Sequence, residues 1–385
     1  MRSLKLTLAA ALLKLSSATY ILEDNYQPSN FFDKFDFFSD ADPSNAFVKY
    51  VDRSTAKHLG LIETRQDAVY MGVDHKSVVS SGAGRKSVRI ETKKTYKHGL
   101  IIADIEHMPG GICGTWPAFW TTGATWPDDG EFDIIEGVNS QQGNKMAVHT
   151  TAGCKIKNNG KFSGQISTPN CDVHAPEQAT NQGCLIDAPN NDGYGPTFNK
   201  NQGGVYATEW TSDAITVWFF PRGQIPQGIK GPNPNPKDWG TPIAQFTGDC
   251  DWDKYMQEQT IIFNTAFCGD WANALWDSDS TCKAKAPTCN EYVKNNPAAF
   301  KNAYWEINYM KVFKKGTLPT TKTTATSTST TATTESTAVT ESTTAIESTT
   351  ATEYPTGTDS TTASTSVTNT PSDTATESSP TADPT

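Results

Sequence analysis

The chain has 385 residues and a formal net charge of −10, with 32 Lys and Arg residues against 42 Asp and Glu residues. The length allows two domains, although all-β domains often reach roughly 200–250 residues as one unit. The acidic balance, without a basic stripe, excludes a typical nucleic-acid-binding surface and favours a neutral or weakly charged partner.

The first eighteen residues have the pattern of a secretory signal peptide. Arg2 and Lys5 give a positive start, residues 6–13 form an apolar stretch, and residues 16–18 offer a small-residue cleavage site. The apolar stretch is too short to cross a bilayer. We therefore predict a secreted, extracellular protein whose residues 1–18 are removed and which has no membrane span.

Residues 19–315 have the pattern of one all-β domain. Runs of β-branched and aromatic residues are separated by turn signals such as Pro109-Gly110-Gly111. The clearest runs are 87–91, 100–105, 214–220, 261–264 and 304–307. Short helices are expected around 31–35 and 291–294, and long helical periodicity is absent. Many short strands with long loops are typical of a β-sandwich or jelly roll.

Eight cysteines lie within this domain, and their even number in a secreted chain predicts up to four disulfides. Their spacings do not include the Cys-x-x-Cys pattern of zinc sites, so we assign no metal to them. The pairing stays open among 105 possibilities. The cysteines are Cys113, Cys154, Cys171, Cys184, Cys250, Cys268, Cys282 and Cys289.

The segment 130–139 carries the strongest functional pattern. Glu131, Asp133 and Glu136 stand among strong strand formers. Carboxylates crowded on one strand repel one another, so the arrangement costs stability. It is expected where two acids must act on one bond, and glycoside cleavage is the chemistry that needs such a pair.

The spacing of the three acids makes a demand on the backbone. Strict alternation would place Glu131 and Asp133 on one face and drive Glu136 into the apolar side. Because an unpaired buried carboxylate is costly, we predict a β-bulge near Ile134 and Ile135 that returns Glu136 to the shared face. The carboxyl separation stays open between ~5–5.5 Å, for a retaining glycosidase, and ~6.5–9.5 Å, for an inverting one, with retention favoured.

Two other interpretations of this segment were weighed. A solvated acidic strand is disfavoured because the acids alternate with Phe and Ile rather than with polar residues. A cation site is the stronger rival, since hard ions take clustered oxygens, although the spacing does not fit an EF-hand loop. Its carboxylates would be Asp128, Asp129, Glu131 and Asp133. A structural calcium has no specific motif here, and we predict no cofactor.

Aromatic residues near the acidic segment are candidates for sugar binding, since their faces pack against pyranose rings. For each tryptophan a place in the core is the alternative, and a lone histidine is more often structural. The candidate substrate-binding residues are Trp116, Trp126, Trp271, Arg89, Asn139 and His149.

From residue 316 the composition changes abruptly, and about 40 of the 70 residues up to 385 are Ser or Thr. Such a segment cannot bury enough apolar surface to offset its ordering entropy, so we expect a disordered tail. A Ser/Thr-rich stretch in a secreted chain is typical of an O-glycosylated stalk, which could associate with a cell wall. A bare flexible tail is the alternative.

The stretch Thr115-Trp116-Pro117-Ala118, followed by the acidic segment 130–139, resembles glycoside hydrolase family 16. More narrowly, it is similar to the fungal laminarinase-like endo-β-1,3(4)-glucanases. Supporting stretches are 50–52, 84–89, 194–199, 217–222 and 267–271. The resemblance implies a β-jelly roll whose concave sheet forms an open cleft, a β-glucan substrate, and double displacement with retention.

Carried onto this chain, the resemblance implies that Glu131 is the nucleophile, Glu136 the general acid/base and Asp133 an assisting carboxylate. It further implies that Trp126, His149 and Trp271 line the sugar subsites. Three rivals stay open: a transglycosylase that uses the same residues, a non-catalytic glucan-binding protein, and a structural wall glycoprotein. The linkage preference is also open, and we expect a monomer.

Overall fold

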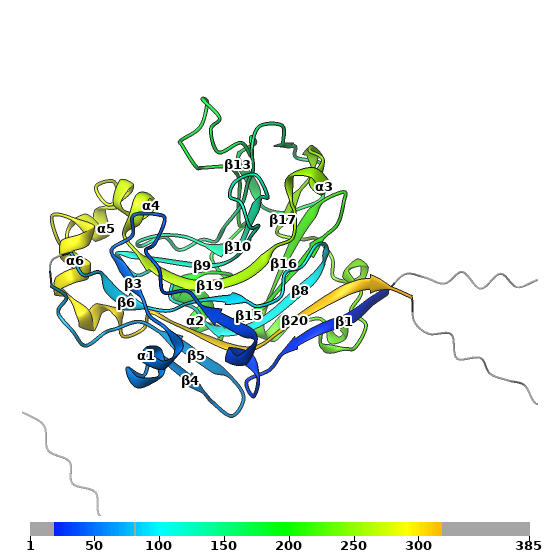
Figure 1. Cartoon of the computed structure of the whole chain (residues 1–385). Helices are drawn as coiled ribbons and strands as arrows, with labels where there is room; N and C mark the ends of the chain where they lie inside the picture. Colours follow the sequence, from blue (N-terminus) through cyan, green and yellow to red (C-terminus); the bar gives the residue numbers. More distant parts are fainter. Residues whose placement is uncertain (1–18, 81, 318–385) are drawn as a thin grey trace, which may run out of the picture. The chain divides into compact units, whose positions relative to one another are not determined.

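The computed structural model describes residues 19–80 and 82–317. The predicted signal peptide and nearly all of the Ser/Thr-rich tail lie outside these residues, so their boundaries and roles stay predictions. Within the described residues, two eight-stranded antiparallel sheets form a sandwich (Figure 1). This is the all-β architecture expected from the sequence.

One layer, which we name the outer sheet, has the order β17-β16-β15-β8-β20-β5-β4, with β1 also paired to β20. Its strands are β1 (Thr19–Tyr26), β4 (Ile62–Thr64), β5 (Val69–Gly72), β8 (Gly99–His107), β15 (Gly204–Trp210), β16 (Ile215–Pro221), β17 (Ala244–Phe246) and β20 (Tyr304–Gly316).

The other layer, the cleft sheet, has the order β13-β14-β11-β10-β9-β19-β7-β2. Its strands are β2 (Phe35–Phe37), β7 (Arg89–Thr92), β9 (Thr115–Thr122), β10 (Glu131–Glu136), β11 (Lys145–His149), β13 (Gln165–Thr168), β14 (Cys184–Asp187) and β19 (Thr260–Phe267). Two small ladders complete the strands: β3 (Val48–Tyr50) with β6 (Arg85–Ser87), and β12 (Lys155–Ile156) with β18 (Gly248–Asp249).

The core fills the space between the two layers. Phe119 of β9 stacks on Phe263 of β19 with ring centroids 4.2 Å apart, and both side chains are buried. Phe132 of β10 belongs to the same buried cluster as Ile101 and Ile105 of the outer sheet. Burying one such side chain stabilises a fold by about 1.5–3 kcal/mol. Because side chains alternate between the two faces of a strand, the burial of Phe132 leaves the opposite face of β10 for polar groups.

The strand runs predicted from the sequence all fall in strands, with one difference. The run 87–91 is divided: Ser87 ends β6, opposite Tyr50 of β3 in a parallel pair, and Arg89 begins β7 in the cleft sheet. The two predicted short helices are also present, as the 3-10 helix η1 (Phe31–Lys34) and as α6 (Cys289–Asn295). No helix in residues 19–80 and 82–317 is long and apolar enough to cross a membrane.

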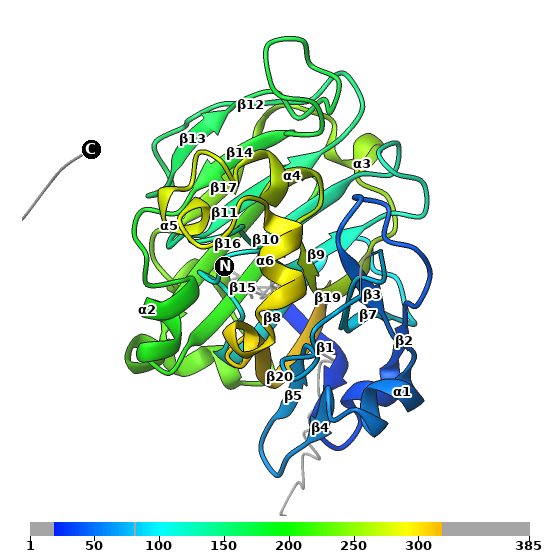
Figure 2. The same ribbon diagram turned by 90° about the vertical axis from the view of Figure 1, so that its left-hand side faces the viewer.

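The described helices are short, and three of them gather at one end of the sandwich, on the left in Figure 1 and facing the viewer in Figure 2. These three are α4 (Gly269–Ala274), α5 (Ser280–Lys283) and α6, and we name the segment 268–295 the helical rim. The other helices are α1 (Arg53–His58), α2 (Gly195–Lys200) and α3 (Trp252–Tyr255), with 3-10 turns η2 (Arg222–Gln224), η3 (Gln227–Lys230), η4 (Pro236–Asp238) and η5 (Pro297–Phe300).

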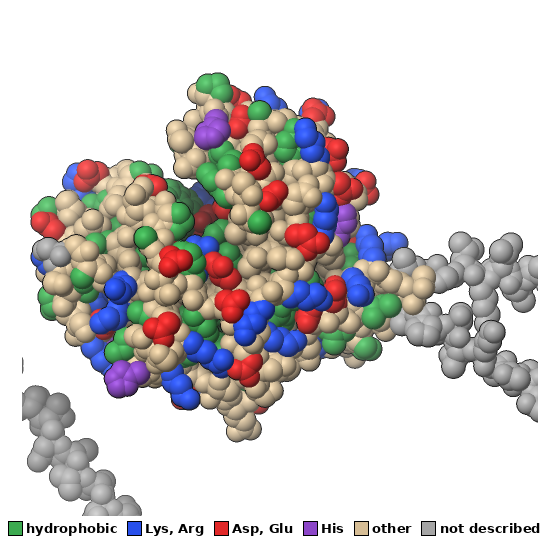
Figure 3. Space-filling view, viewed as in Figure 1, with side chains coloured by type: hydrophobic (Ala, Val, Ile, Leu, Met, Phe, Trp, Pro, Cys, Tyr) green, Lys and Arg blue, Asp and Glu red, His purple; other side chains and the backbone are tan. Residues whose placement is uncertain are grey.

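All eight cysteines are paired, which gives the maximum of four disulfides expected from their number. Cys113–Cys282 and Cys268–Cys289 hold the helical rim. Cys154–Cys250 and Cys171–Cys184 hold the long loops that lead into β13 and β14, and we name the segment 150–183 the loop rim. The surface is hollowed between the two rims (Figure 3), above the cleft sheet.

Candidate active site

Strand β10 contains the predicted bulge. Its pairing with β9 shifts register between Asp133 and Ile135, so that one residue of β10 is extra. As a result Glu131, Asp133 and Glu136 lie opposite Thr122, Trp120 and Ala118, alternate residues on one face of β9. Both Ile134 and Ile135 are fully buried. The extra residue thus resolves the conflict between alternation and the position of Glu136, as the sequence analysis expected.

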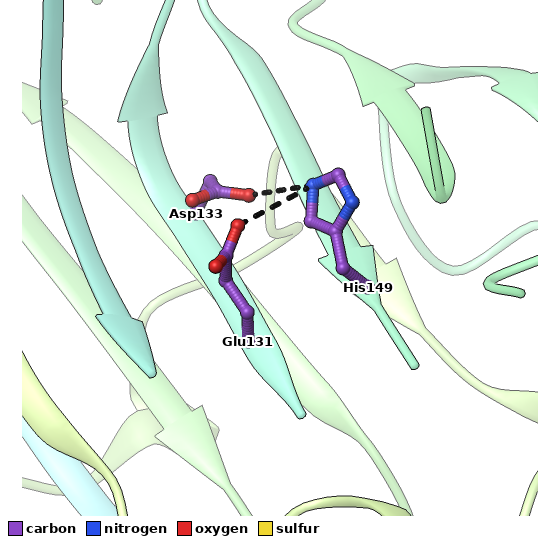
Figure 4. Close-up of side chains that lie close together, drawn as sticks. All are labelled: Glu131, Asp133 and His149. Atoms are coloured by element: carbon purple, nitrogen blue, oxygen red, sulfur yellow. Dashed lines mark ion pairs between the residues drawn. The ribbon is translucent and has the colours of Figure 1, made fainter. Parts of the chain in front are cut away.

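Two of the acids share a histidine from the neighbouring strand. His149 of β11 lies directly opposite Glu131, and both Glu131 and Asp133 point toward its ring (Figure 4). Its Nε2 atom is 3.2 Å from Oδ2 of Asp133 and 3.7 Å from Oε1 of Glu131. The histidine that was predicted to line a sugar subsite therefore also contacts the carboxylates themselves.

The environment of the three acids opposes their ionisation. Burial raises the pKa of Glu131 from 4.5 to about 8, with repulsion from Asp133 as a second cause. The pKa of Glu136 rises to about 8 for the same two reasons. Asp133, only 2% exposed, has its pKa raised well above 3.8 by burial. Because all three pKa values are raised, the site keeps a protonated carboxyl group near neutral pH, as a general acid requires.

Glu136 is held by a tryptophan from the helical-rim side of the site. Nε1 of Trp116 donates a hydrogen bond of 2.8 Å to Oε1 of Glu136, and this bond acts to lower the pKa of that carboxyl. The ring of Trp116 packs edge-to-face on Trp271 of α4, with centroids 5.8 Å apart. Two predicted sugar-binding tryptophans therefore stand together beside Glu136.

At the other end of β10, Trp126 lies in the loop from β9, close in sequence to Glu131. It is 42% exposed, unusual for so large an apolar side chain, and its peptide bond to Pro127 is cis. Such an exposed aromatic face is suited to a sugar ring.

The side chain of Arg89 packs within the cleft sheet and is not extended into solvent. Its guanidinium pairs with Glu91 at 2.7 Å and lies over the rings of Phe38 and Trp120. The side chain is largely buried. Arg89 thus supports the aromatic floor, and its predicted contact with substrate stays a prediction.

Asn139, a predicted substrate-binding residue, is buried beside the helical rim, and its contact with substrate stays a prediction. The residue is 1% exposed, and its amide is used within the protein. Oδ1 accepts from the N–H of Gly114 at 3.0 Å, and Nδ2 donates to the carbonyl of Ala272 at 2.8 Å. Asn139 therefore joins the loop that follows the acidic strand to the helical rim.

The four-carboxylate cation site weighed from the sequence is not assembled. Asp128 is exposed, and Asp129 accepts a hydrogen bond from the N–H of Thr125 within its own turn. Within the described residues, the set close enough to share an ion is Glu131, Asp133 and His149, whose ligand atoms lie within 4.8 Å of one another. These are the groups that the predicted sugar chemistry uses.

Two buried asparagines beside the site were not singled out from the sequence. Asn264 of β19 accepts from Nε1 of Trp120 at 2.8 Å and donates to the Tyr50 hydroxyl at 2.9 Å. Asn144, just before β11, bonds to the backbone of β10. An asparagine in or beside a strand has no local signal for such a role, because its partners come from distant strands.

Comparison with known proteins places this geometry in a family. Residues 35–313 match the XgeA-like catalytic domain of glycoside hydrolase family 16. The chain belongs to glycoside hydrolase family 16. An endo-1,3(4)-β-glucanase of Arthroderma benhamiae is 57% identical over 327 residues, which cover 84% of this chain and 71% of that protein.

Other members of the family agree. A probable endo-1,3(4)-β-glucanase of Aspergillus fumigatus is 46% identical over 80% of this chain and 47% of its own length, so the chain spans about half of that relative. Among solved structures, laminarinase 16A of Phanerochaete chrysosporium with bound β-glucans is 42% identical with a TM-score of 0.72. An elongating family 16 β-1,3-glucosyltransferase is 44% identical with a TM-score of 0.72. Both alignments cover 77% of this chain and 100% of the other.

Proposed function

We propose that this domain hydrolyses internal bonds of β-1,3(4)-glucans by double displacement with retention. The observation that carries the proposal is the bulged strand β10 of the cleft sheet, which presents Glu131, Asp133 and Glu136 on one face. The names of the family 16 relatives, endo-1,3(4)-β-glucanases and laminarinases, support the substrate class.

In this mechanism Glu136, protonated, gives its proton to the glycosidic oxygen while ionised Glu131 attacks the anomeric carbon. Glu136 then takes a proton from the incoming water, and the sugar leaves with its original configuration. Asp133 keeps the three carboxyl groups from ionising together, since like charges at close range raise one another's pKa. His149 lies beside Glu131 and Asp133 and limits this repulsion.

The proposal is tested by incubating the purified domain with laminarin, lichenan and xyloglucan. We expect a rapid fall in the viscosity or size of laminarin, lichenan or both, with xyloglucan intact, and NMR of the first products should show β-anomers. Turnover of none of the three glucans would refute the proposed activity, and initial α-anomers would refute retention.

A transglycosylase is the second candidate, since a 44% identical relative is described as an elongating β-1,3-glucosyltransferase. Both reactions share the first step and differ in whether water or a sugar hydroxyl attacks the glycosyl-enzyme. Product chromatography with laminarioligosaccharides at high concentration separates them. Products longer than the starting oligosaccharide would favour transfer.

Replacing Trp116 by Phe should shift the pH profile of hydrolysis upward. The change removes the N–H that stabilises the Glu136 carboxylate, so the pKa of Glu136 rises and the acid keeps its proton to a higher pH. The basic limb of kcat/KM against pH on laminarin should therefore move to higher pH. Trp120→Phe is the matched control, because its N–H bonds to the Asn264 amide rather than to a carboxylate. An equal shift in both variants would contradict the explanation.

Replacing Trp126 by Ala should weaken substrate binding with little effect on the chemistry. Loss of one exposed stacking surface is expected to raise KM for laminarin about 5- to 30-fold, corresponding to about 1–2 kcal/mol, while kcat changes less than about threefold. Because Trp126 is 42% exposed, the melting temperature should not fall. A reduced kcat at unchanged KM would show that Trp126 acts on the reacting groups instead.

We further propose that the protein acts outside the cell as a monomer. The four disulfides support an oxidising compartment, because such bonds rarely persist in the cytosol. N-terminal sequencing of protein from the culture medium should find a start near residue 19. Size-exclusion chromatography with light scattering tests the oligomeric state.

A further inference from the structure

Strand β10 loses its pairing with β11 at the point where the bulge begins, while its pairing with β9 continues to Glu136. Its pairing with β11 runs from Glu131 opposite His149 to Asp133 opposite Ala147. The register shift against β9 follows between Asp133 and Ile135. On the side of β11, the peptide groups of β10 beyond Asp133 therefore need other partners, because buried backbone groups are seldom left unpaired.

One side chain supplies these partners. Nδ2 of Asn144 donates a hydrogen bond of 2.8 Å to the carbonyl of Ile134, and its Oδ1 accepts one of 2.8 Å from the N–H of Glu136. The first bond goes to the extra residue itself, since Ile134 has no partner on β9, and the second goes to the N–H two residues further along the strand. The amide of Asn144 thus replaces a peptide group of β11 and fixes the bulge in the form that turns Glu136 toward the hollow.

The placement of Asn144 is itself well determined. The residue is 1% exposed, and its own carbonyl accepts a hydrogen bond of 3.0 Å from the N–H of Ala188 after β14. Asparagine suits the position because one flat group offers both an acceptor and donors, as a peptide does. Aspartate lacks the donor, and an aliphatic residue lacks both.

We propose that Asn144 is the positioning residue for the general acid/base: by bonding to Ile134 and Glu136, it holds the Glu136 carboxyl where it can protonate the leaving group. This inference rests on the proposed function, in which Glu136 supplies that proton. Loss of Asn144 should leave the rest of the cleft in place and impair proton donation.

The test compares two substrates in Asn144→Ala: laminarin, whose leaving group needs a proton, and 2,4-dinitrophenyl β-laminaribioside, whose leaving group does not. General acid catalysis contributes about 10²–10⁴-fold, so a misplaced acid should cost about 10- to 100-fold in kcat on laminarin. On the aryl substrate the glycosylation rate, followed as the first burst of dinitrophenol, should change less than about threefold. Asn144→Asp keeps the acceptor for the N–H of Glu136 and is the variant to measure if the alanine variant does not fold. It should lose less kcat on laminarin than Asn144→Ala, again with little change on the aryl substrate.

Asn139→Ala is the matched control. That residue is equally buried, and its amide likewise joins one backbone N–H to one carbonyl, but away from the bulge. Any loss of activity in Asn139→Ala should be equal for the two substrates. An equal loss on both substrates in the Asn144 variants, or no loss, would overturn the positioning role. A parent protein that cleaves neither substrate would instead overturn the proposed function, and this inference with it.

Discussion

Replacing Glu131 by Ala is expected to leave a folded protein that has lost at least about 10⁴-fold of its kcat on laminarin, because the reaction loses its nucleophile. Azide should restore turnover of 2,4-dinitrophenyl β-laminaribioside by entering the vacated space and attacking the anomeric carbon directly. The product should be the α-glycosyl azide, identified by NMR. Substantial glucan hydrolysis by the variant, or a β-azide product, would show that Glu131 is not the nucleophile.

The same substitution should change how stability depends on pH. The folded-state pKa of Glu131 is about 8, against 4.5 without the fold, so its protonated form favours the folded state. The stability from this proton is fully present below about pH 4.5 and is lost as the pH rises through about 8. Glu131→Ala removes this dependence. Its melting temperature should therefore fall less than that of the parent between pH 5 and 9, and a steeper fall would contradict the raised pKa.

Replacing Glu136 by Ala should produce a different pattern, in which the loss depends on the leaving group. Hydrolysis of laminarin should fall about 10²- to 10⁴-fold, because the glycosidic oxygen must leave without a proton. Dinitrophenol needs no proton, so the first step on the aryl substrate should persist and the glycosyl-enzyme should accumulate.

Azide also tests which of the two glutamates is the nucleophile and which is the acid/base. In Glu136→Ala it should attack the accumulated glycosyl-enzyme and yield the β-glycosyl azide, since two inversions restore the original configuration. An α-azide from this variant, together with a β-azide from Glu131→Ala, would exchange the assignments. The raised pKa values of Glu131 and Glu136 are alike and do not distinguish the two roles. The two variants are therefore needed to decide which glutamate is the nucleophile and which is the acid/base.

The strand that carries the acids was predictable in detail because its constraint is local. Side chains alternate along a strand, so the spacing from Asp133 to Glu136 allows either a buried charge or one extra residue, and the burial cost decides for the bulge. Trp116 and Trp126 were singled out for a similar reason, since they lie close in sequence to the acids, and their contact with substrate stays a prediction.

The features that sequence did not provide depend on contacts between distant segments. Asn139 lies next to the acidic motif, yet its amide is used by Gly114 and Ala272, which no local pattern indicates. In the sequence, Asn144 is an ordinary polar residue before a strand, and only the structure shows its bonds to Ile134 and Glu136. The disulfide pairing was equally inaccessible, since Cys113 and Cys282 are 169 residues apart.

The four disulfides divide the molecule into parts that can change at different rates. Two bonds secure the helical rim and two secure the loop rim, while the catalytic strand between them depends on sheet pairing and core packing. Cys171–Cys184 ties the loop rim to the first residue of β14. The walls of the cleft can therefore be lengthened, shortened or exchanged as separate cassettes while the carboxylates stay in place. Related proteins can in this way differ in glucan preference while they keep the same three carboxylates.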